Sequence, residues 1–211
     1  MDIAIPLYDR FTALDAVGPY EVLWRLPGAR VHWIGAEARP YATDRGLKLV
    51  AEERFDDVPA PDVLVVPGGT GTLAALEDGR HVDWIRTAHA AATWTTSVCT
   101  GALLLGAAGV LDGLRATTHW AYMDRLAQYS AEATSDRVVE QGRVITSAGV
   151  SSGIDMALVL AARIAGDDVA QAIQLRIEYD PEPPFDTGSL AKAPARIAEL
   201  AQSPTPASAA V

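Results

Sequence analysis

The chain has 211 residues, of which 49% are hydrophobic and 21% are charged, the balance of an ordinary globular protein. It carries 17 basic and 27 acidic residues, a formal net charge of −10, which disfavours nucleic acid and anionic membranes as partners. No apolar segment reaches the ~18 residues of a membrane helix, the start lacks the basic region of a signal peptide, and a single cysteine fits a reducing compartment. These features predict a cytoplasmic protein.

The first part of the chain alternates strand-like and helical segments. The predicted elements are, in chain order, a strand over 2–7, a helix over 14–26, a strand over 30–34, a hairpin over 41–55 and a strand over 63–66. Thr12 or Asp15 is the candidate N-cap of the helix, and Pro27-Gly28 ends it. The last strand, Val-Leu-Val-Val, is apolar throughout, which is typical of a strand buried on both faces of a parallel sheet.

The second part continues this alternation. Its predicted elements are a helix over 81–92, a strand over 94–98, a helix over 101–108, a hairpin over 134–146 that turns at Gln141-Gly142, and helices over 154–164 and 169–177. Strands that alternate with helices predict an α/β/α sandwich with a mainly parallel sheet. We expect one domain over residues 1–188. The Ala-, Pro- and Ser-rich tail over 189–211 is expected to be unstructured apart from a turn near Ile197.

Cys99 stands at a strand-to-helix junction. The segment 94–98 is typical of a strand and ends at the cysteine, and a Gly-Ala-Leu helix begins at Gly101. This is the layout of a nucleophile elbow, in which Gly101 lets the helix pass close to the sheet. Backbone N–H groups and the positive helix end are expected to lower the thiol pKa, so that thiolate is available near neutral pH. The alternative is a cysteine that acts only as a small buried hydrophobic residue.

Two further segments end at the same edge of the predicted sheet. Gly68 and Gly69 follow an apolar strand, and their N–H groups are expected to form an oxyanion hole for charge on a substrate; the alternative is an ordinary turn. Asp15 follows the first strand. It is either a helix cap or an acid beside the sulfur, kept protonated by its anionic neighbour so that it can move a proton.

A third strand-turn-helix and one histidine complete the candidate site. Backbone N–H groups from Val150 onward are predicted to point at the Cys99 pocket, unless Ser151 or Ser152 merely caps the helix. His119 is the nearest candidate histidine; the alternative is a helix-start or packing residue next to Trp120. The other three histidines have no carboxylate or cysteine spaced to complete a metal site, so we expect no metal.

Five segments together resemble the ThiJ/PfpI superfamily, whose members have a glutamine-amidotransferase-like, flavodoxin-type fold. The segments are Leu14-Asp15-x-x-Gly18-Pro19, Val66-Pro67-Gly68-Gly69, Ser97-Val98-Cys99-Thr100-Gly101, Ala116-Thr117-Thr118-His119-Trp120 and the run from Leu175 to Phe185. The Cys-Thr-Gly and Thr-Thr-His-Trp strings are more specifically similar to the branch of isonitrile-hydrating enzymes. The resemblance covers residues 1–188.

The resemblance implies catalysis by Cys99 as nucleophile, Asp15 as acid and Thr100 as a further catalytic residue. The implied reaction converts an organic isonitrile into an N-substituted formamide through a thioimidate on the cysteine, in a homodimer without metal or organic cofactor. Gly68, Gly69, Val150 and His119 are then expected to bind the substrate. Proteases of the superfamily carry histidine directly after the nucleophile, and Thr100 in that place disfavours a Cys–His protease.

Two other functions fit nearly the same signals. One is a ligand-sensing domain like the N-terminal part of AraC-type regulators, although a basic helix-turn-helix region is not found after residue 188. The other is a redox sensor, in which a low-pKa Cys99 is oxidised to sulfenate or sulfinate. Hydrolases and glyoxalase-type lyases of the superfamily are further possibilities.

Overall fold

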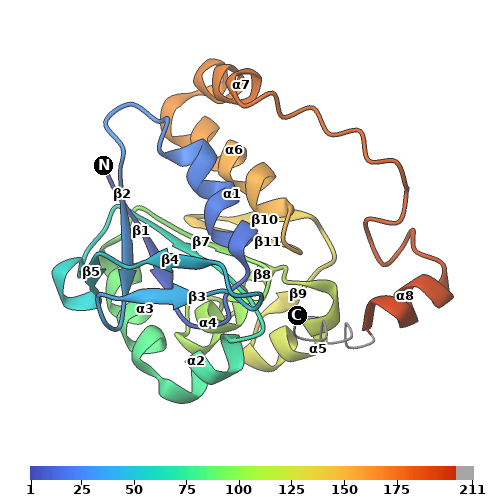
Figure 1. Cartoon of the computed structure of the whole chain (residues 1–211), viewed down its shortest axis with the longest axis horizontal. Coiled ribbons are helices and arrows are strands. Elements are labelled where there is room, and N and C mark those ends of the chain that lie inside the picture. Colours follow the sequence, from blue (N-terminus) through green and yellow to red (C-terminus); the bar gives the residue numbers. More distant parts are fainter. Residues whose placement is uncertain (203–211) are drawn as a thin grey trace. The chain divides into compact units, whose positions relative to one another are not determined.

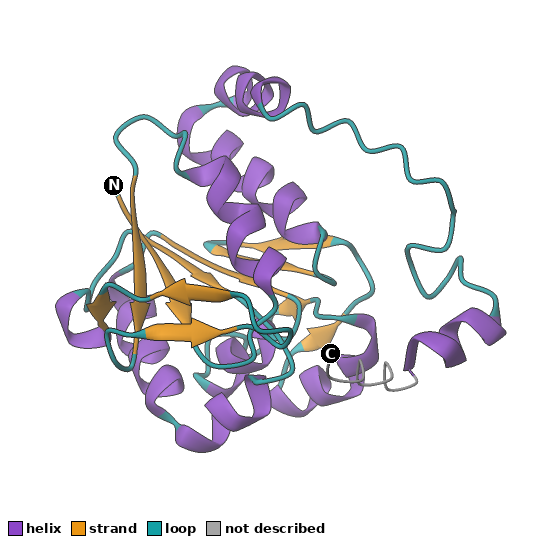
Figure 2. Ribbon diagram, in the orientation of Figure 1, coloured by secondary structure: helices purple, strands orange, loops and turns teal. Residues whose placement is uncertain are grey.

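A seven-stranded sheet organises residues Met1–Tyr179 (Figures 1 and 2). The structure is a computed structural model that describes residues 1–202. In chain order the strands of this sheet are β1 (Asp2–Leu7), β2 (Arg30–Gly35), β5 (Glu53–Arg54), β6 (Val63–Val66), β7 (Trp94–Val98), β10 (Val138–Gln141) and β11 (Val144–Ser147). Their spatial order is β10-β11-β7-β6-β1-β2-β5, and only β10 pairs antiparallel with its neighbour. The predicted sandwich with a mainly parallel sheet is confirmed.

Helices cover both faces of the sheet (Figure 1). One face carries α1 (Ala13–Leu23), α6 (Ser152–Ala165) and α7 (Asp167–Arg176), and the other carries α2 (Thr72–Asp78), α3 (Arg80–Ala91), α4 (Gly101–Ala107) and the short α5 (Met123–Leu126). Smaller elements are the pairs β3 (Pro40–Ala42) with β4 (Lys48–Val50) and β8 (Arg115–Ala116) with β9 (Glu132–Ala133), and the 3₁₀ turns η1 (Phe55–Asp57), η2 (Trp120–Tyr122) and η3 (Ala127–Tyr129).

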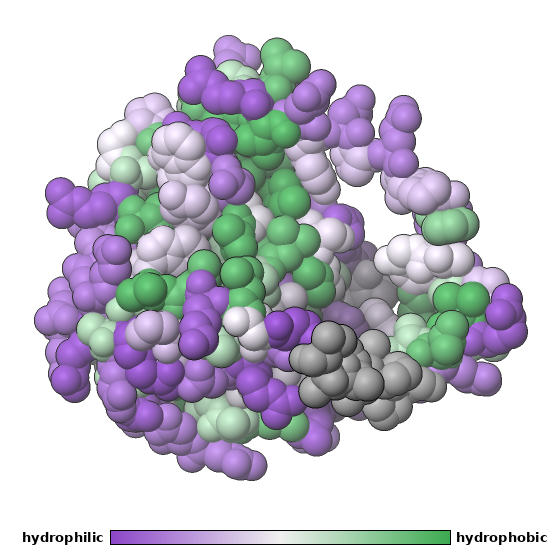
Figure 3. Space-filling view, in the orientation of Figure 1, coloured by the Kyte–Doolittle hydropathy of each residue, from purple (hydrophilic) through white to green (hydrophobic). Residues whose placement is uncertain are grey.

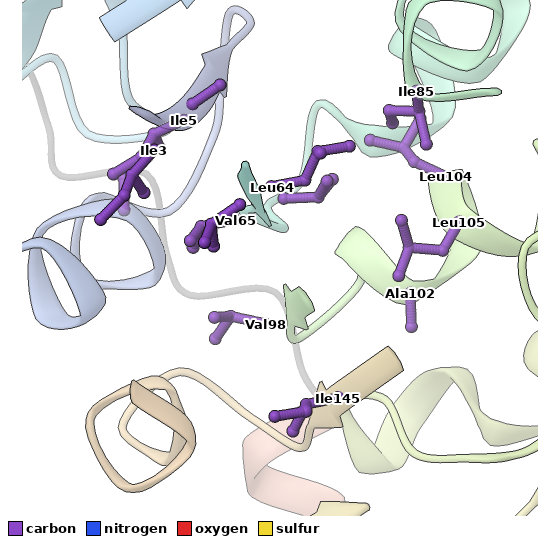
Figure 4. Packing of buried hydrophobic residues seen from close by; sticks show 14 of the residues in the cluster. Ile3, Ile5, Leu64, Val65, Ile85, Val98, Ala102, Leu104, Leu105 and Ile145 are labelled. Carbon is purple, nitrogen blue, oxygen red and sulfur yellow. The ribbon is translucent and has the colours of Figure 1, made fainter. Parts of the chain in front are cut away.

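The core lies between the sheet and these helices. All four residues of β6 are fully buried, as expected for a central strand covered on both faces. Because side chains alternate along a strand, Leu64 lies toward Ile85 of α3 and Leu104 of α4, whereas Val65 lies on the opposite side (Figure 4). Burying each such side chain stabilises the fold by roughly 1.5–3 kcal/mol. The sheet is therefore a rigid platform for the loops at its edge.

The predicted elements and the observed ones differ mainly in short segments. The strands over 2–7, 63–66 and 94–98 have the predicted bounds. The helix α2 is not predicted, because its seven residues carry too little periodicity. The expected hairpin over 41–55 forms as β3 and β4, but residues 53 and 54 leave it and pair with β2 in the main sheet.

The compact unit ends at Tyr179, earlier than the expected boundary at residue 188. The second unit begins at Asp180 and contains α8 (Ala195–Gln202), a full helix where one turn near Ile197 was expected. Residues 203–211 of the predicted tail lie outside the described residues. No helix within residues 1–202 is both long and apolar enough to cross a membrane.

The surface of the compact unit mixes hydrophilic and hydrophobic residues, as the face drawn in Figure 3 shows. Its exposed large apolar side chains are Leu14, Trp24, Leu47, Val50 and Leu175.

Candidate active site

Cys99 occupies a strained turn between β7 and α4. Its φ of 55° lies in the left-handed region, which for a residue with a side chain costs about 1–3 kcal/mol. Hydrogen bonds hold this conformation: the Cys99 N–H donates to the carbonyls of Ser147 (3.1 Å) and Ala148 (2.8 Å), and the Thr118 hydroxyl donates to the Cys99 carbonyl (2.8 Å). A Cβ at Gly101 would clash with the Val66 carbonyl oxygen, so α4 passes close to the sheet as predicted. The nucleophile elbow is present.

Asp15 lies in the first turn of α1 and is fully buried. Thr12 occupies the N-cap position, so the aspartate side chain is directed into the site instead of capping the helix. Its Oδ2 accepts a hydrogen bond from the Gly68 N–H (3.0 Å), while Oδ1 has no bond of ordinary geometry among the described residues. Burial raises the pKa of Asp15 to about 7, against the opposing effects of the Gly68 N–H and of hydrogen bonding with the Cys99 thiol. This carboxyl therefore binds and releases a proton near neutral pH.

The Cys99 thiol keeps its proton in the resting site. It is 5% exposed, and burial, followed by the charge of Asp15, raises its pKa to about 12. The expectation of a thiolate at neutral pH is wrong, because desolvation of the anion outweighs the helix end and the backbone N–H groups. Those groups are nevertheless present: the N–H groups of Thr100 and Val150 and the Thr100 hydroxyl all act to lower the pKa of Cys99. The predicted orientation of the Val150 N–H toward the sulfur is thus observed.

Gly68 and Gly69 hold the site together in a way that differs from the expected oxyanion hole. The Gly68 N–H donates to Asp15, and the Gly69 N–H donates to the Thr100 hydroxyl oxygen (2.9 Å), so neither is free for charge on a substrate. The physical reason is proximity: a Cβ at Gly68 would clash with the Thr100 backbone nitrogen. The glycine loop therefore lies directly against the Cys99 turn and positions the acid and the threonine.

Thr100 connects the site to two residues that sequence reasoning missed. Its hydroxyl oxygen lies 2.7 Å from that of Thr72, which in turn lies 2.9 Å from the Tyr8 hydroxyl. All three side chains are buried. Tyr8 directly follows β1 at the carboxyl edge of the sheet, and this position is the signal that could have identified it. Thr118 was also missed, although it belongs to the Thr-Thr-His-Trp string.

His119 begins the turn η2 and packs beside the site. Its Nδ1 accepts a hydrogen bond from the Ala121 N–H (3.3 Å), and its ring lies 5.4 Å from that of Trp120, which are contacts that the alternative of a helix-start and packing residue predicts. A Cβ at Gly149 would lie 3.1 Å from the His119 ring. His119 is therefore next to the backbone that leads to Val150, and burial lowers its pKa. Substrate binding by His119 stays a prediction.

The remaining histidines have structural partners. His32 lies between Glu53 (2.6 Å) and Asp2 (3.0 Å), the buried His81 ring contacts the Leu7 carbonyl, and His89 contacts Thr95. Within residues 1–202 no group of three or more His, Cys, Asp or Glu side chains is arranged to hold a metal ion.

The fold and site define an α/β protein with a buried cysteine on a nucleophile elbow and an acid beside it. The DJ-1/PfpI family model matches residues 1–163, and the chain belongs to that family. The chain is 45% identical to the isonitrile hydratase of Pseudomonas putida, over 96% of its own length and 89% of the enzyme's. It is 28% identical to the HTH-type transcriptional regulator GbdR of Pseudomonas aeruginosa, over 84% of its own length but only half of the regulator's.

Solved structures agree with this assignment. The crystal structure of a ThiJ/PfpI family protein from Pseudomonas syringae superimposes with a TM-score of 0.92 at 39% identity, covering 95% of this chain and 84% of that protein. Drosophila melanogaster DJ-1beta superimposes with a TM-score of 0.76 at 22% identity, covering 84% of this chain and 97% of that protein, which shows a shared fold.

Proposed function

We propose that this protein hydrates organic isonitriles to N-substituted formamides, with Cys99 as nucleophile and Asp15 as the group that carries protons. One observation supports this most directly. A thiol and a carboxyl that binds a proton near neutral pH are buried side by side, in a chain 45% identical to an isonitrile hydratase. A general acid–base group is most effective when its pKa lies near the working pH.

In the first half of the proposed reaction the thiol adds to the terminal carbon of the isonitrile. The Cys99 proton passes to the Asp15 carboxylate, the sulfur forms a bond to the carbon, and Asp15 delivers the proton to the same carbon. The product is a thioimidate, in which sulfur, one hydrogen and the doubly bonded nitrogen share that carbon. This sequence suits a thiol of raised pKa, because the free thiolate never has to accumulate.

In the second half water replaces the sulfur. Asp15 accepts a proton from the attacking water and gives it to the nitrogen, which leaves a carbon bonded to sulfur, hydroxyl and amine. The carbon–sulfur bond then breaks, the hydroxyl proton returns to the sulfur through Asp15, and the formamide departs. The sum is isonitrile plus water, so the reaction as written needs no metal or organic cofactor.

The surrounding groups have supporting roles in this proposal. The N–H groups of Thr100 and Val150 stabilise negative charge on the sulfur as it forms and as it leaves. Gly68 and Gly69 hold Asp15 and Thr100 in place. His119 lies beside the Gly149–Val150 backbone and, in this proposal, forms part of the wall that contacts the substrate's organic group.

The test is to incubate the protein with a small panel of alkyl and aryl isonitriles and to follow formamide formation by NMR. We expect the wild type to form one formamide for each isonitrile consumed, over many turnovers, and Cys99→Ala to form none. Mass spectrometry of acid-quenched protein should show Cys99 carrying the added mass of one intact isonitrile. The absence of formamide with every member of the panel would contradict the proposal.

A ligand sensor is the second candidate, because the chain also matches half the length of a transcriptional regulator. A sensor would be stabilised thermally by an isonitrile or another small ligand without consuming it, equally in wild type and Cys99→Ala. Turnover excludes this interpretation.

The proposal also includes a homodimer in the cytoplasm, as the resemblance implies. Light scattering of the purified chain tests the first statement, and fractionation of the source cells tests the second.

A further inference from the structure

A chain of three buried hydroxyl groups leads away from Cys99. Thr100, directly after the nucleophile, contacts Thr72 (2.7 Å between the hydroxyl oxygens), and Thr72 contacts Tyr8 (2.9 Å). Thr100 and Thr72 are each 2% exposed and Tyr8 is 4% exposed. Buried hydroxyl groups in contact polarise one another, so a change at one end of such a chain affects the other.

Each of these hydroxyls has more than one possible acceptor for its single proton. Tyr8 lies 2.9 Å from the Pro67 carbonyl, Thr72 lies 2.8 Å from the Gly69 carbonyl, and Thr100 lies 3.2 Å from that same carbonyl. The alternative acceptor is in each case the next group toward the sulfur: Thr72 for Tyr8, Thr100 for Thr72, and Cys99 for Thr100. A hydroxyl donates only one hydrogen bond at a time, and each close pair of hydroxyl oxygens must share one proton. The three hydroxyls therefore have two consistent arrangements, in which all of them donate away from the sulfur or all of them donate toward it.

We propose that Tyr8 and Thr72 are positioning residues, which turn their protons toward the sulfur through Thr100 when Cys99 becomes anionic. With the neutral thiol, Thr100 donates to Thr72, Thr72 to Tyr8 and Tyr8 to the Pro67 carbonyl, so that each close pair of hydroxyl oxygens shares one proton. With the thiolate, Thr100 donates to the sulfur, Thr72 to Thr100 and Tyr8 to Thr72. A hydrogen bond to an anion is about twice as strong as one between neutral groups, which favours the second arrangement. The proposal rests on the proposed role of Cys99 as nucleophile.

Two features suit Tyr8 to the outer end of this chain. Burial raises its pKa well above the ordinary value, so the phenol keeps the proton that it must donate. Its ring packs edge-on against His81, 5.4 Å away, which fixes the position of the hydroxyl. This relay of the Tyr8, Thr72 and Thr100 hydroxyls requires only rotation of their O–H groups, and no covalent bond is made or broken.

The chain also offers matched controls. Tyr41 is a buried tyrosine whose hydroxyl donates to the Glu37 carbonyl and accepts from the Glu37 N–H (3.1 Å each), with no link to Thr72 or Thr100. Thr96 is a buried threonine whose hydroxyl donates to the Leu64 carbonyl (2.9 Å). Tyr41→Phe and Thr96→Val therefore remove the same kind of bond outside the relay.

The test uses alkylation by iodoacetamide, which reports Cys99 alone because the chain has one cysteine. Between about pH 7 and pH 10, where the rate follows the thiolate fraction, Tyr8→Phe should lower the alkylation rate at every pH by about threefold, and Thr72→Val by about tenfold. Tyr41→Phe and Thr96→Val should leave it unchanged. Thr72→Ser, which keeps the hydroxyl, should restore it. With an isonitrile substrate, kcat should fall in parallel while KM stays near the wild-type value.

The outcomes separate this inference from the proposed function. Lowered alkylation in the relay variants supports the relay even if no isonitrile is converted, whereas isonitrile turnover with unchanged alkylation of folded variants overturns the relay alone. Melting temperature verifies folding. If Thr72→Val does not fold, the test rests on Tyr8→Phe, which retains the ring packing. An unchanged alkylation rate of Cys99 in Tyr8→Phe contradicts the proposal.

Discussion

Two turns, one at the amino end and one at the carboxyl end of the parallel strands, have nearly the same φ angle but different residues. Gly142, between β10 and β11, has φ 60°, and Cys99, between β7 and α4, has φ 55°. A Cβ at Gly142 would have no neighbour within 4 Å, so its conformation alone explains the glycine there. At Cys99 a similar φ is adopted by a residue with a side chain, and it is held by two hydrogen bonds that the Cys99 N–H donates and one that its carbonyl accepts from Thr118.

The difference shows where the chain tolerates strain. A glycine satisfies a left-handed turn at little energetic cost, and the cysteine in its place agrees with the proposed role of the sulfur. The supports of the two turns differ accordingly. Gly142 closes a simple antiparallel hairpin, whereas Cys99 is fixed by β11, by Thr118 and by the glycine loop after β6. Four predictions test this contrast, in order of decreasing expected effect.

Alanine should abolish isonitrile hydration at one of the two turns and leave it unchanged at the other. Cys99→Ala should lower isonitrile hydration to the uncatalysed rate, because no other group can form the thioimidate. Gly142→Ala should leave turnover near the wild-type value, since only the hairpin is strained. Steady-state formamide formation measures both. Loss of activity in Gly142→Ala with an intact fold would show that the hairpin is part of the functional machinery.

Asp15→Asn should remove the proton carrier and lower kcat by about 10²–10⁴-fold. It should also change how stability depends on pH. Burial raises the pKa of Asp15 from 3.8 to about 7, so between these values the folded protein holds a proton that the unfolded chain has released. Wild-type stability therefore falls as pH rises from about 4 to about 7, by a few kcal/mol from this group, and stays lower above that range.

The asparagine variant lacks this loss. Its melting temperature relative to wild type should therefore rise across the same interval, and differential scanning calorimetry at several pH values measures it. A constant difference would mean that Asp15 ionises normally in the folded protein.

Thr100→Val should lower turnover by about ten- to a hundredfold, because it removes the hydroxyl that acts on the sulfur and leaves the Gly69 N–H without its partner. Thr100→Ser is the matched control and should retain most activity. Unchanged kinetics in the valine variant would mean that the Thr100 hydroxyl has no role in turnover and that Thr100 only leads the chain into α4.

The smallest expected effect is that of backbone strain on the free energy of unfolding. At position 99 glycine should be more stable than alanine by about 1 kcal/mol, and at position 142 glycine should be preferred by a similar amount. Denaturant unfolding of Cys99→Ala, Cys99→Gly, wild type and Gly142→Ala gives both differences. Equal stability of the two variants at position 99 would show that the Cys99 turn is not strained.

Sequence patterns located the elements and the elbow because these depend on local signals. The strand before Cys99 and the helix after it are marked by a β-prone run and by Gly101, and both were found within a residue of their ends. Asp15 was placed correctly at the same edge because it follows β1. The short α2 was missed because seven residues carry too little periodicity.

The properties that were wrong or missed depend on distances between loops. The Gly68 and Gly69 N–H groups bind Asp15 and Thr100 only because two loops meet closely, which spacing along the chain does not encode. The raised pKa of Cys99 likewise follows from burial that exists only after folding. Sequence patterns indicate that a helix end lowers the pKa of a nearby thiol. They do not indicate the desolvation, which has the larger effect on the pKa of Cys99.

The protonated state of Cys99 has a consequence for chemical durability. Peroxides oxidise thiolates far faster than thiols, and the burial that raises the pKa of Cys99 keeps its thiolate scarce at neutral pH. In the proposed reaction the sulfur becomes an anion only as it meets its reaction partner, so between encounters it is spared from conversion to sulfinic and sulfonic acid. The burial that makes Cys99 depend on Asp15 in this proposal thus also slows the oxidation of its sulfur.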